Sequence, residues 1–139
     1  MIVLDTNVVS ALMADSPDAA VVDWFDRQPA ESIWTTAITV FEVRLGIAGL
    51  PAGKRRTALQ SEFEKVLAED IEHRVLDFDS AAAVEAAALA AERERRGRPI
   101  DVRDTFIAGI AVARRATLAT RNVRHFSDLP VPVVSPWAA

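Results

Sequence analysis

The chain of 139 residues contains no cysteine. This absence excludes disulfide bonds, thiolate zinc sites and cysteine nucleophiles, and it suits a reducing compartment. No apolar stretch approaches the roughly 20 residues that a membrane-spanning helix needs. Asp5 interrupts the apolar N-terminus too early for a signal peptide, and no basic segment precedes it. We therefore expect a cytoplasmic protein that has no membrane segment.

Histidine is also scarce. His73 and His125 are the two histidines, and their separation in the sequence argues against a paired metal site. A solvent-exposed or structural role is the simpler interpretation of His125. Any metal site in this chain is therefore expected to consist of oxygen ligands.

Length and composition favour one folded domain over residues 1–139. Half of the residues are apolar, so disorder is not expected. A chain of this size buries roughly two-thirds of the surface that its unfolded form exposes. No internal repeat, low-complexity segment or linker divides the sequence, which predicts a single domain.

The net charge of −4 argues against nucleic acid as a partner without excluding it, because a bound cation supplies local positive charge. Basic residues nevertheless cluster along the chain. Solvated helix faces are the simplest interpretation of each cluster. The clusters are Lys54–Arg56, Arg93 to Arg98 with Arg103, Arg114–Arg115, and Arg121 with Arg124.

Short strand-like segments alternate with longer helical patterns, which predicts a parallel α/β/α sandwich of three layers. Thr36 and Asp101 are suitable helix N-caps, and three prolines around the last segment favour an edge strand. The predicted strands are Ile2–Leu4, Ser32–Thr35, Arg74–Phe78, Thr117–Thr120 and Val131–Val134. The predicted helices run from Asp5 to about Met13, Ser16 to about Arg27, Ala37–Ala48, Gly53 to about Ala68, Asp79 or Ser80 to about Arg96, and Asp101 to about Arg115.

Four polar side chains lie just past, or about one turn past, these strands: Asp5, Glu42, Asp104 and Asn122. In a parallel sheet such positions gather at the edge where ligands bind. Carboxylates without lysine neighbours repel one another, and a hard divalent cation relieves that repulsion. The pattern therefore predicts a metal site built by Asp5, Glu42 and Asp104.

Each acid also has an alternative interpretation. Asp5 is a plausible cap for the first helix, and Glu42 could point outward to pair with Arg44 or another surface base. Against the latter, Glu42 lies in an apolar helix, and Gly46 four residues on leaves an open patch beside it. Asp101 and Asp104 share a helical turn, and we assign Asp101 as the cap and Asp104 as the ligand, although the two could exchange roles.

Four motifs in this order resemble those of PIN-domain proteins, in particular the VapC/FitB-like ribonuclease toxins. The opening Met1–Ser10 resembles the first motif, Thr36–Gly46 the second, Asp104–Ala111 the third and Leu118–Phe126 the fourth. Pro136-Trp137 resembles the common ending. Each motif alone is moderately specific, but the four together cover essentially the whole chain.

The resemblance implies a compact α/β/α domain with a mostly parallel five-stranded sheet. It also implies an acidic pocket that binds Mg²⁺ or Mn²⁺ and cleaves single-stranded RNA, as a toxin of a type II toxin–antitoxin system. By position, Asp5, Glu42 and Asp104 match the metal-site acids, and Asn122 completes the catalytic set. Around these we expect Thr6, Asn7, Asp101, Thr120 and Arg121 to orient the acids or contact the substrate.

The fourth position departs from the family pattern, because many members have Asp where this chain has Asn122. An amide brings no charge, so we expect one firmly held ion instead of two. Asp128 lies too far along the chain to be the first choice as a substitute for the acid that is missing at the fourth position.

The resemblance also implies partners: RNA, a small VapB- or FitA-like antitoxin, and a second copy in a homodimer. Apolar residues around Val21–Phe25 and in Ala37–Ala48 could serve either core or interface. We interpret Trp24, Trp34 and Trp137 as packing residues.

Two other functions deserve comparison. A haloacid-dehalogenase-like phosphatase also begins with a strand that ends in Asp, but it needs a second Asp where this chain has Asn7. A PIN-like module that binds RNA or protein without catalysis would explain the missing fourth acid. The second alternative predicts metal-independent binding and no cleavage.

Overall fold

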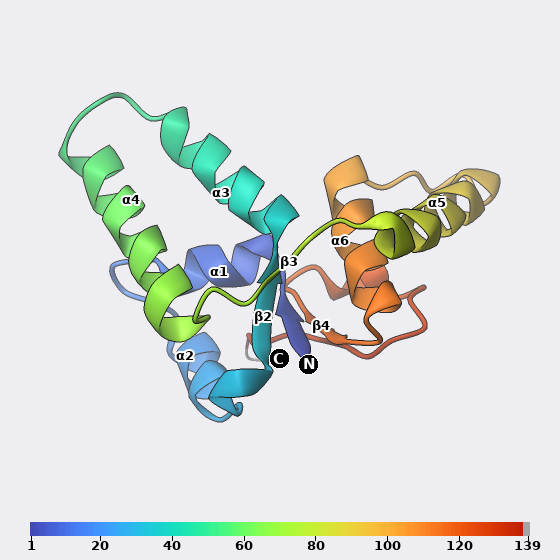
Figure 1. Ribbon diagram of the computed structural model, residues 1–139, viewed down its shortest axis with the longest axis horizontal. Coiled ribbons are helices and arrows are strands. Elements are labelled where there is room, and N and C mark those ends of the chain that lie inside the picture. Colours follow the sequence, from blue (N-terminus) through green and yellow to red (C-terminus); the bar gives the residue numbers. More distant parts are fainter. Residues whose placement is uncertain (138–139) are drawn as a thin grey trace.

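The computed structural model describes residues 1–137. Its centre is a sheet of five strands in the order β3-β2-β1-β4-β5, with every neighbouring pair parallel (Figure 1). This confirms the predicted parallel sheet and its five strands. The strands are β1 (Ile2–Leu4), β2 (Ile33–Thr36), β3 (Val75–Leu76), β4 (Thr117–Ala119) and β5 (Val133–Val134).

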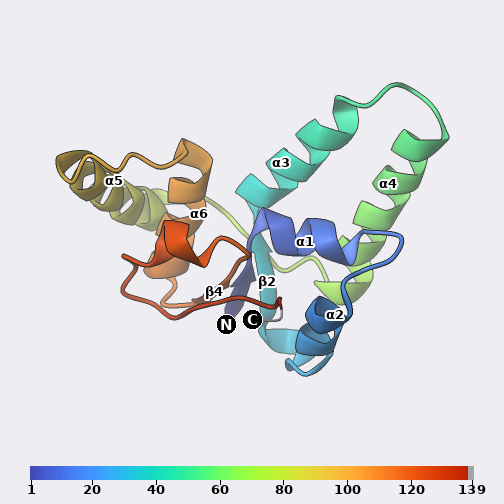
Figure 2. The ribbon, with the colours of Figure 1, turned by 180° about the vertical axis from the view of Figure 1, so that it is seen from behind.

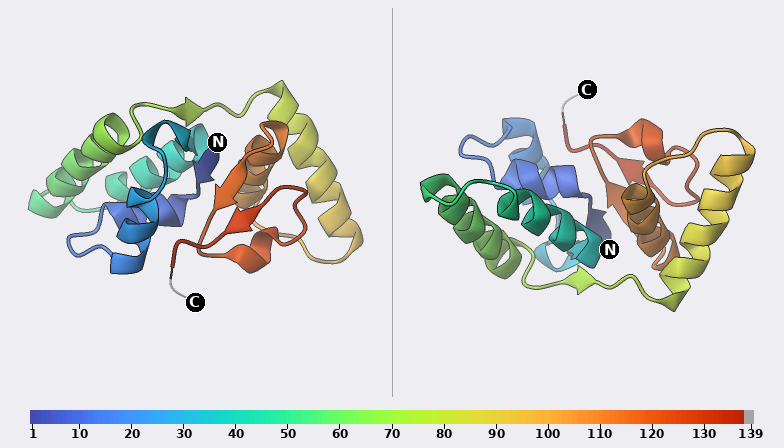
Figure 3. Two further views of the ribbon diagram at one scale, coloured as in Figure 1. Left: turned by 90° about the horizontal axis from the view of Figure 1, so that it is seen from below. Right: turned by 90° about the horizontal axis from the view of Figure 1, so that it is seen from above.

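Helices cover both faces of the sheet, which confirms the three layers. The first four helices lie on one face and the last two on the other, as Figures 1 and 2 show from opposite sides. Figure 3 shows α4 and α5 at opposite ends of the molecule. The helices are α1 (Thr6–Leu12), α2 (Ala19–Asp26), α3 (Ala37–Ala48), α4 (Lys54–Lys65), α5 (Ser80–Arg95) and α6 (Val102–Ala113).

Each face of the sheet has its own apolar core. On the side of α1–α4, Leu4 and Ile33 of the sheet pack with Val8, Val43 and Phe63 of the helices. On the other side, a second core joins the sheet to α5 and α6. It includes Val3, Leu118, Ile107, Ile110 and Phe126. The strand β1 buries side chains toward both cores. All of its residues must therefore be apolar, and the sequence of β1 meets this requirement.

The alanine-rich sequence of α5 allows it to approach α6 closely. A Cβ atom added to Gly109 would lie 2.6 Å from the carbonyl oxygen of Ala82 and 2.7 Å from the Cβ of Ala86. No side chain fits in that space, so glycine is required at position 109 for this contact. The contact fixes α6, whose first turn carries Asp104.

The order of the strands creates a switch point beside β1. The chain runs outward from β1 through β2 to β3, and then returns to place β4 on the other side of β1. Ligands of open parallel sheets bind in the crevice outside the carboxyl ends of the strands at such a point. Asp5 follows β1 and Thr120 follows β4, so both lie at this crevice.

All predicted elements are present, but several boundaries differ. The strands predicted over Arg74–Phe78 and Val131–Val134 are shorter, Val75–Leu76 and Val133–Val134. The second helix was expected to have Pro17 in its first turn, but it begins at Ala19, because the Asp18 carboxylate accepts from the Ala20 amide and caps it. The helix expected to about Ala68 ends as an α-helix at Lys65 and continues as a π-turn, Val66–Asp70. Short 3₁₀ turns at Ala30–Ser32 and Val123–Phe126 were not predicted.

None of the helices within residues 1–137 combines the length and the apolar character that crossing a bilayer demands.

Candidate active site

Asp5 is the most buried acid of the site, with 3% of its surface exposed. It caps α1 by accepting from the Thr6 amide at 2.8 Å, and it accepts from the Thr120 hydroxyl at 2.7 Å and the Asn7 side-chain amide at 3.3 Å. Its own amide donates to the carbonyl of Ala119. Asp5 therefore does cap the helix, as the alternative interpretation held, but the same carboxylate also lines a cavity.

Opposing effects act on the charge of Asp5. Burial raises its pKa above the ordinary value, and the negative charge of Glu42 adds to this increase. Hydrogen bonds from Thr120, Thr6 and Asn7 stabilise the carboxylate and lower the pKa. Burial is the largest effect, so a nearby positive charge would stabilise the ionised form.

Glu42 projects from α3 toward Asp5. The Thr6 hydroxyl donates to its carboxylate at 2.8 Å, and the same hydroxyl lies 3.0 Å from that of Thr39. The Arg103 guanidinium is 3.8 Å away. The alternative pairing with Arg44 is wrong, because Arg44 pairs with Glu64 at 2.9 Å, but Glu42 does have another surface base, Arg103, beside it while it lines the cavity.

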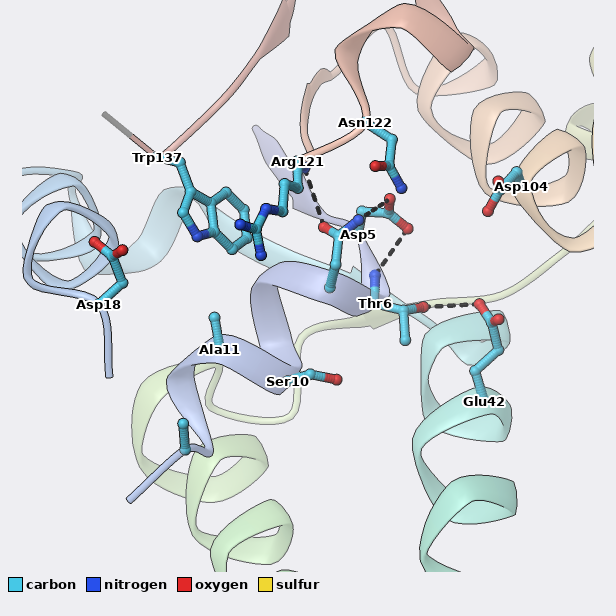
Figure 4. A pocket seen from close by; sticks show the side chains of 12 residues that line it. Asp5, Thr6, Ser10, Ala11, Asp18, Glu42, Asp104, Arg121, Asn122 and Trp137 are labelled. Atoms are coloured by element: carbon cyan, nitrogen blue, oxygen red, sulfur yellow. Dashed lines mark hydrogen bonds between the residues drawn. The ribbon is translucent and has the colours of Figure 1, made fainter. Parts of the chain in front are cut away.

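Asp104 lies in the first turn of α6, across the cavity from α1 (Figure 4). Burial and the negative charges of Asp5, Asp101 and Glu42 raise its pKa to about 6. His125 acts in the opposite direction, with its Nδ1 atom 3.9 Å from the carboxylate. This pKa records that the carboxylates are close enough to repel one another.

Asp101 has the capping role predicted for it. Its carboxylate accepts from the Arg103 amide at 2.8 Å and begins α6. It does not line the cavity that holds Asp104, although its charge raises the pKa of that residue.

The residues from β4 and the C-terminal segment form the remaining wall. The Arg121 amide donates to the Asn7 side chain at 3.1 Å, and the Asn122 amide donates to the Thr120 hydroxyl at 3.1 Å. The Arg121 guanidinium lies 5.0 Å from the centre of the Trp137 ring (Figure 4). Because Asn7 also contacts Asp5, this wall is tied directly to the buried acid.

These side chains line one cavity of about 710 Å³, which we name the acid cavity. It collects every predicted catalytic residue. Two of the predicted supporting residues, Thr120 and Asp101, do not line the cavity. Thr120 is linked to it by its hydrogen bond to Asp5, and Asp101 caps α6. The lining comprises Asp5, Thr6, Asn7, Ser10, Ala11, Ala14, Asp18, Glu42, Asp104, Arg121, Asn122 and Trp137.

Sequence reasoning did not assign five members of this lining to the site: Ser10, Ala11, Ala14, Asp18 and Trp137. Asp18 caps α2 and has no strand before it, so no motif distinguished it. Trp137 was predicted to pack. It does pack against the core on the side of α1–α4, but it also borders the cavity. The proline-tryptophan ending was the available signal for its position.

The donor set of the acid cavity fits a hard divalent cation. The carboxylates of Asp5, Asp18, Glu42 and Asp104 and the side-chain amides of Asn7 and Asn122 supply oxygen ligands, which hard divalent cations prefer. Within residues 1–137, no three acidic or histidine side chains are already gathered tightly around one point. The carboxylates therefore share the cavity without being drawn together into a compact ligand set.

A parallel α/β sheet with an oxygen-rich acidic cavity at its switch point defines a class of proteins suited to metal-assisted chemistry on a phosphate-containing ligand. Comparison with known proteins identifies the family. The sequence model of the PIN domain matches residues 2–131, and the chain belongs to this family.

Similar proteins match over nearly their full length. The chain is 42% identical to the VapC ribonuclease Y4jK of Sinorhizobium fredii, covering 99% of this chain and 98% of that protein. It is 36% identical to the toxin FitB of Neisseria gonorrhoeae, covering 99% of both. The crystal structure of FitAcB from Neisseria gonorrhoeae matches with a TM-score of 0.89 and 35% identity over 100% of both chains.

Proposed function

We propose that this protein is the toxin of a type II toxin–antitoxin system and an endoribonuclease that hydrolyses phosphodiester bonds of single-stranded RNA. The observation that carries the proposal is the meeting of Asp5, Glu42 and Asp104 in one cavity at the switch point of the sheet. Full-length similarity to a VapC ribonuclease and a FitB toxin supports the choice of substrate and biological role.

The proposed cofactor is Mg²⁺ or Mn²⁺, held by Asp5, Glu42 and Asp104. Oxygen ligands favour these ions over zinc. Asn122 contributes a neutral amide to the lining and no additional negative charge. One firmly held ion in the free protein is therefore the expected stoichiometry.

The chain's own residues prepare the site for hydrolysis. Thr120, Thr6 and Asn7 fix the orientation of Asp5 through three hydrogen bonds. Held by these acids, a divalent cation would supply a Lewis acid for a phosphate oxygen and for a water molecule. Glu42 or Asp104 would orient the attacking water or accept its proton.

The proposed protein partners are a small VapB- or FitA-like antitoxin and a second copy of this chain. The acid cavity is suited to a basic side chain of the antitoxin. Phe41 and Leu45 on α3 remain exposed and are available to an interface, whereas Val21 belongs to the core. An RNA substrate places the proposed activity in the cytoplasm.

Induced expression of the wild type and Asp5→Asn, followed by mapping of RNA ends, tests this function. We expect new RNA ends and growth arrest with the wild type and neither with the variant. A variant that folds and still cleaves would refute the assignment. Metal-independent RNA binding without cleavage at any Mg²⁺ or Mn²⁺ concentration would instead support the non-catalytic module.

A further inference from the structure

A second pocket, rich in arginine, lies beside the acid cavity. It has a volume of about 190 Å³ and is formed by two segments far apart in the sequence, residues 93–100 and residues 124–128. We name it the arginine pocket and define it by Arg93, Arg96, Arg98, Arg124, His125 and Asp128. Solvated helix faces do not describe this arrangement, because tertiary packing gathers the charges around one hollow.

Arg93 forms the structural base of the arginine pocket. Its side chain is 3% exposed and makes two hydrogen bonds to Asp128, at 2.9 and 3.1 Å. It also donates to the carbonyl of His125 and the hydroxyl of Thr105. Because Asp128 balances its charge, Arg93 holds the two segments together and contributes little free positive charge.

Arg98 and Arg124 supply the available charge. Both are exposed, and within residues 1–137 neither forms an ion pair. Arg96 is partly neutralised by Glu92 at 3.0 Å. Two free guanidinium groups facing one hollow present the fork of donors that suits a phosphate.

The arginine pocket and the acid cavity share no lining residue, but they meet at one contact. His125 lines the pocket, and its Nδ1 atom lies 3.9 Å from the carboxylate of Asp104, which lines the cavity. The 3₁₀ turn Val123–Phe126 carries Arg124 and His125 on from Asn122 of the acid cavity. A chain of phosphates that crosses Asp104 can therefore continue directly into the arginine pocket.

We propose that the arginine pocket binds a backbone phosphate of the RNA that flanks the scissile phosphate. This inference rests on the proposed ribonuclease function and deepens it, because it assigns a direction in which the substrate leaves the acid cavity. With a net charge of −4, the protein as a whole repels RNA. Binding therefore needs local positive charge, which the unpaired arginines of this pocket supply.

The test measures RNA binding over a series of salt concentrations, using Asp5→Asn to prevent cleavage and fluorescein-labelled single-stranded RNA as the probe. The test variant adds Arg98→Gln and Arg124→Gln. The control adds Arg114→Gln and Arg115→Gln, which removes the same charge from exposed positions at the far end of α6. For every phosphate that the protein no longer neutralises, the slope of log K against log salt decreases in magnitude by about 0.7.

We expect the slope to become shallower in the test variant and to stay unchanged in the control. An unchanged slope in the test variant, an equal change in both variants, or no RNA binding by Asp5→Asn would overturn the proposal. Melting curves establish that each variant is folded. If the glutamine variant is unfolded, Arg98→Ala and Arg124→Ala are measured singly, and a slope unchanged in both refutes the pocket.

Cleavage of two substrates separates this inference from the proposed function. A dinucleoside monophosphate contains only the scissile phosphate and has none for the arginine pocket, so we expect equal cleavage by the wild type and Arg98→Gln/Arg124→Gln. A longer RNA should be cut more slowly by the variant. If the wild type cuts neither substrate, the proposed function fails, while the salt slopes still decide whether the arginine pocket binds RNA.

Discussion

The Thr120 hydroxyl donates a 2.7 Å hydrogen bond to the carboxylate of Asp5, although 115 positions separate the two residues in the sequence. Both are buried. The bond joins the ends of β1 and β4 at the switch point of the sheet. It holds the central acid in one orientation and lowers its pKa against the effect of burial.

Replacing Thr120 with valine keeps the shape of the side chain and removes this donor. We expect the free energy of unfolding to fall by about 1–3 kcal/mol, because the Asp5 carboxylate loses a buried hydrogen bond. RNA cleavage should slow by about 10–100-fold, as for other residues that orient metal ligands. Denaturant unfolding and single-turnover cleavage measure the two effects. Thr117→Val, on the same strand, is the matched control, and equal effects in both variants would count against the role of Thr120.

Asp104→Asn should stabilise the metal-free protein at neutral pH. The folded-state pKa of Asp104 is raised to about 6, so the folded protein binds this proton more tightly than the unfolded chain. Its contribution to stability is present at low pH and is lost as the pH rises through about 6. Thermal unfolding in a chelator checks this. We expect the variant to melt above the wild type at pH 7, with the difference vanishing below about pH 4, the ordinary pKa of an aspartate. A variant that melts lower at pH 7 contradicts the repulsion.

Mg²⁺ or Mn²⁺ should raise the melting temperature of the wild type, because the ion relieves repulsion present only in the folded protein. At a free concentration of about 100 times Kd the stabilisation is about 2.7 kcal/mol. Asp5→Asn should lose most of this response. A melting temperature that stays flat over millimolar metal would argue that the three carboxylates share no ion.

Asn122→Asp should enable a second ion to bind. The substitution adds a carboxylate to the lining of the acid cavity beside Asp5, Glu42 and Asp104. We expect titration calorimetry to find one ion in the wild type and two in the variant. In the absence of metal the variant should be less stable, since the added charge faces existing carboxylates. Two ions in the wild type would show that the amide suffices.

Asp128→Ala should destabilise the protein by about 3 kcal/mol, because it leaves the Arg93 guanidinium buried without a counter-charge. Arg93→Met/Asp128→Ala should recover part of this stability, since no buried charge remains. Denaturant unfolding of both single variants and the double variant gives the coupling energy. Additive effects would mean that the two residues act independently.

The sequence by itself determined the features that depend on neighbouring residues. Apolar runs predicted the strands, and side chains such as Thr36, Asp79 and Asp101 cap the predicted helices. Placing Asp5 at the carboxyl edge needed only the rule that parallel strands end together. Such properties are local, because they follow from periodicity, capping and the order of polar residues after strands. For Asp104 the expectation was wrong in its reason, because α5 separates Asp104 from the preceding strand and only the packing of α6 brings it to the cavity.

Only the tertiary structure decided which distant groups meet. The order of the strands brings Thr120 to Asp5, and the packing of α1 beside α3 brings Thr6 to Glu42. The packing of residues 93–100 against residues 124–128 gathers the arginine pocket. Burial and the charges of Asp5, Asp101 and Glu42 raise the pKa of Asp104. Charges and hydrogen bonds act over a few ångströms, so their effects depend on distances in space that sequence separation does not specify.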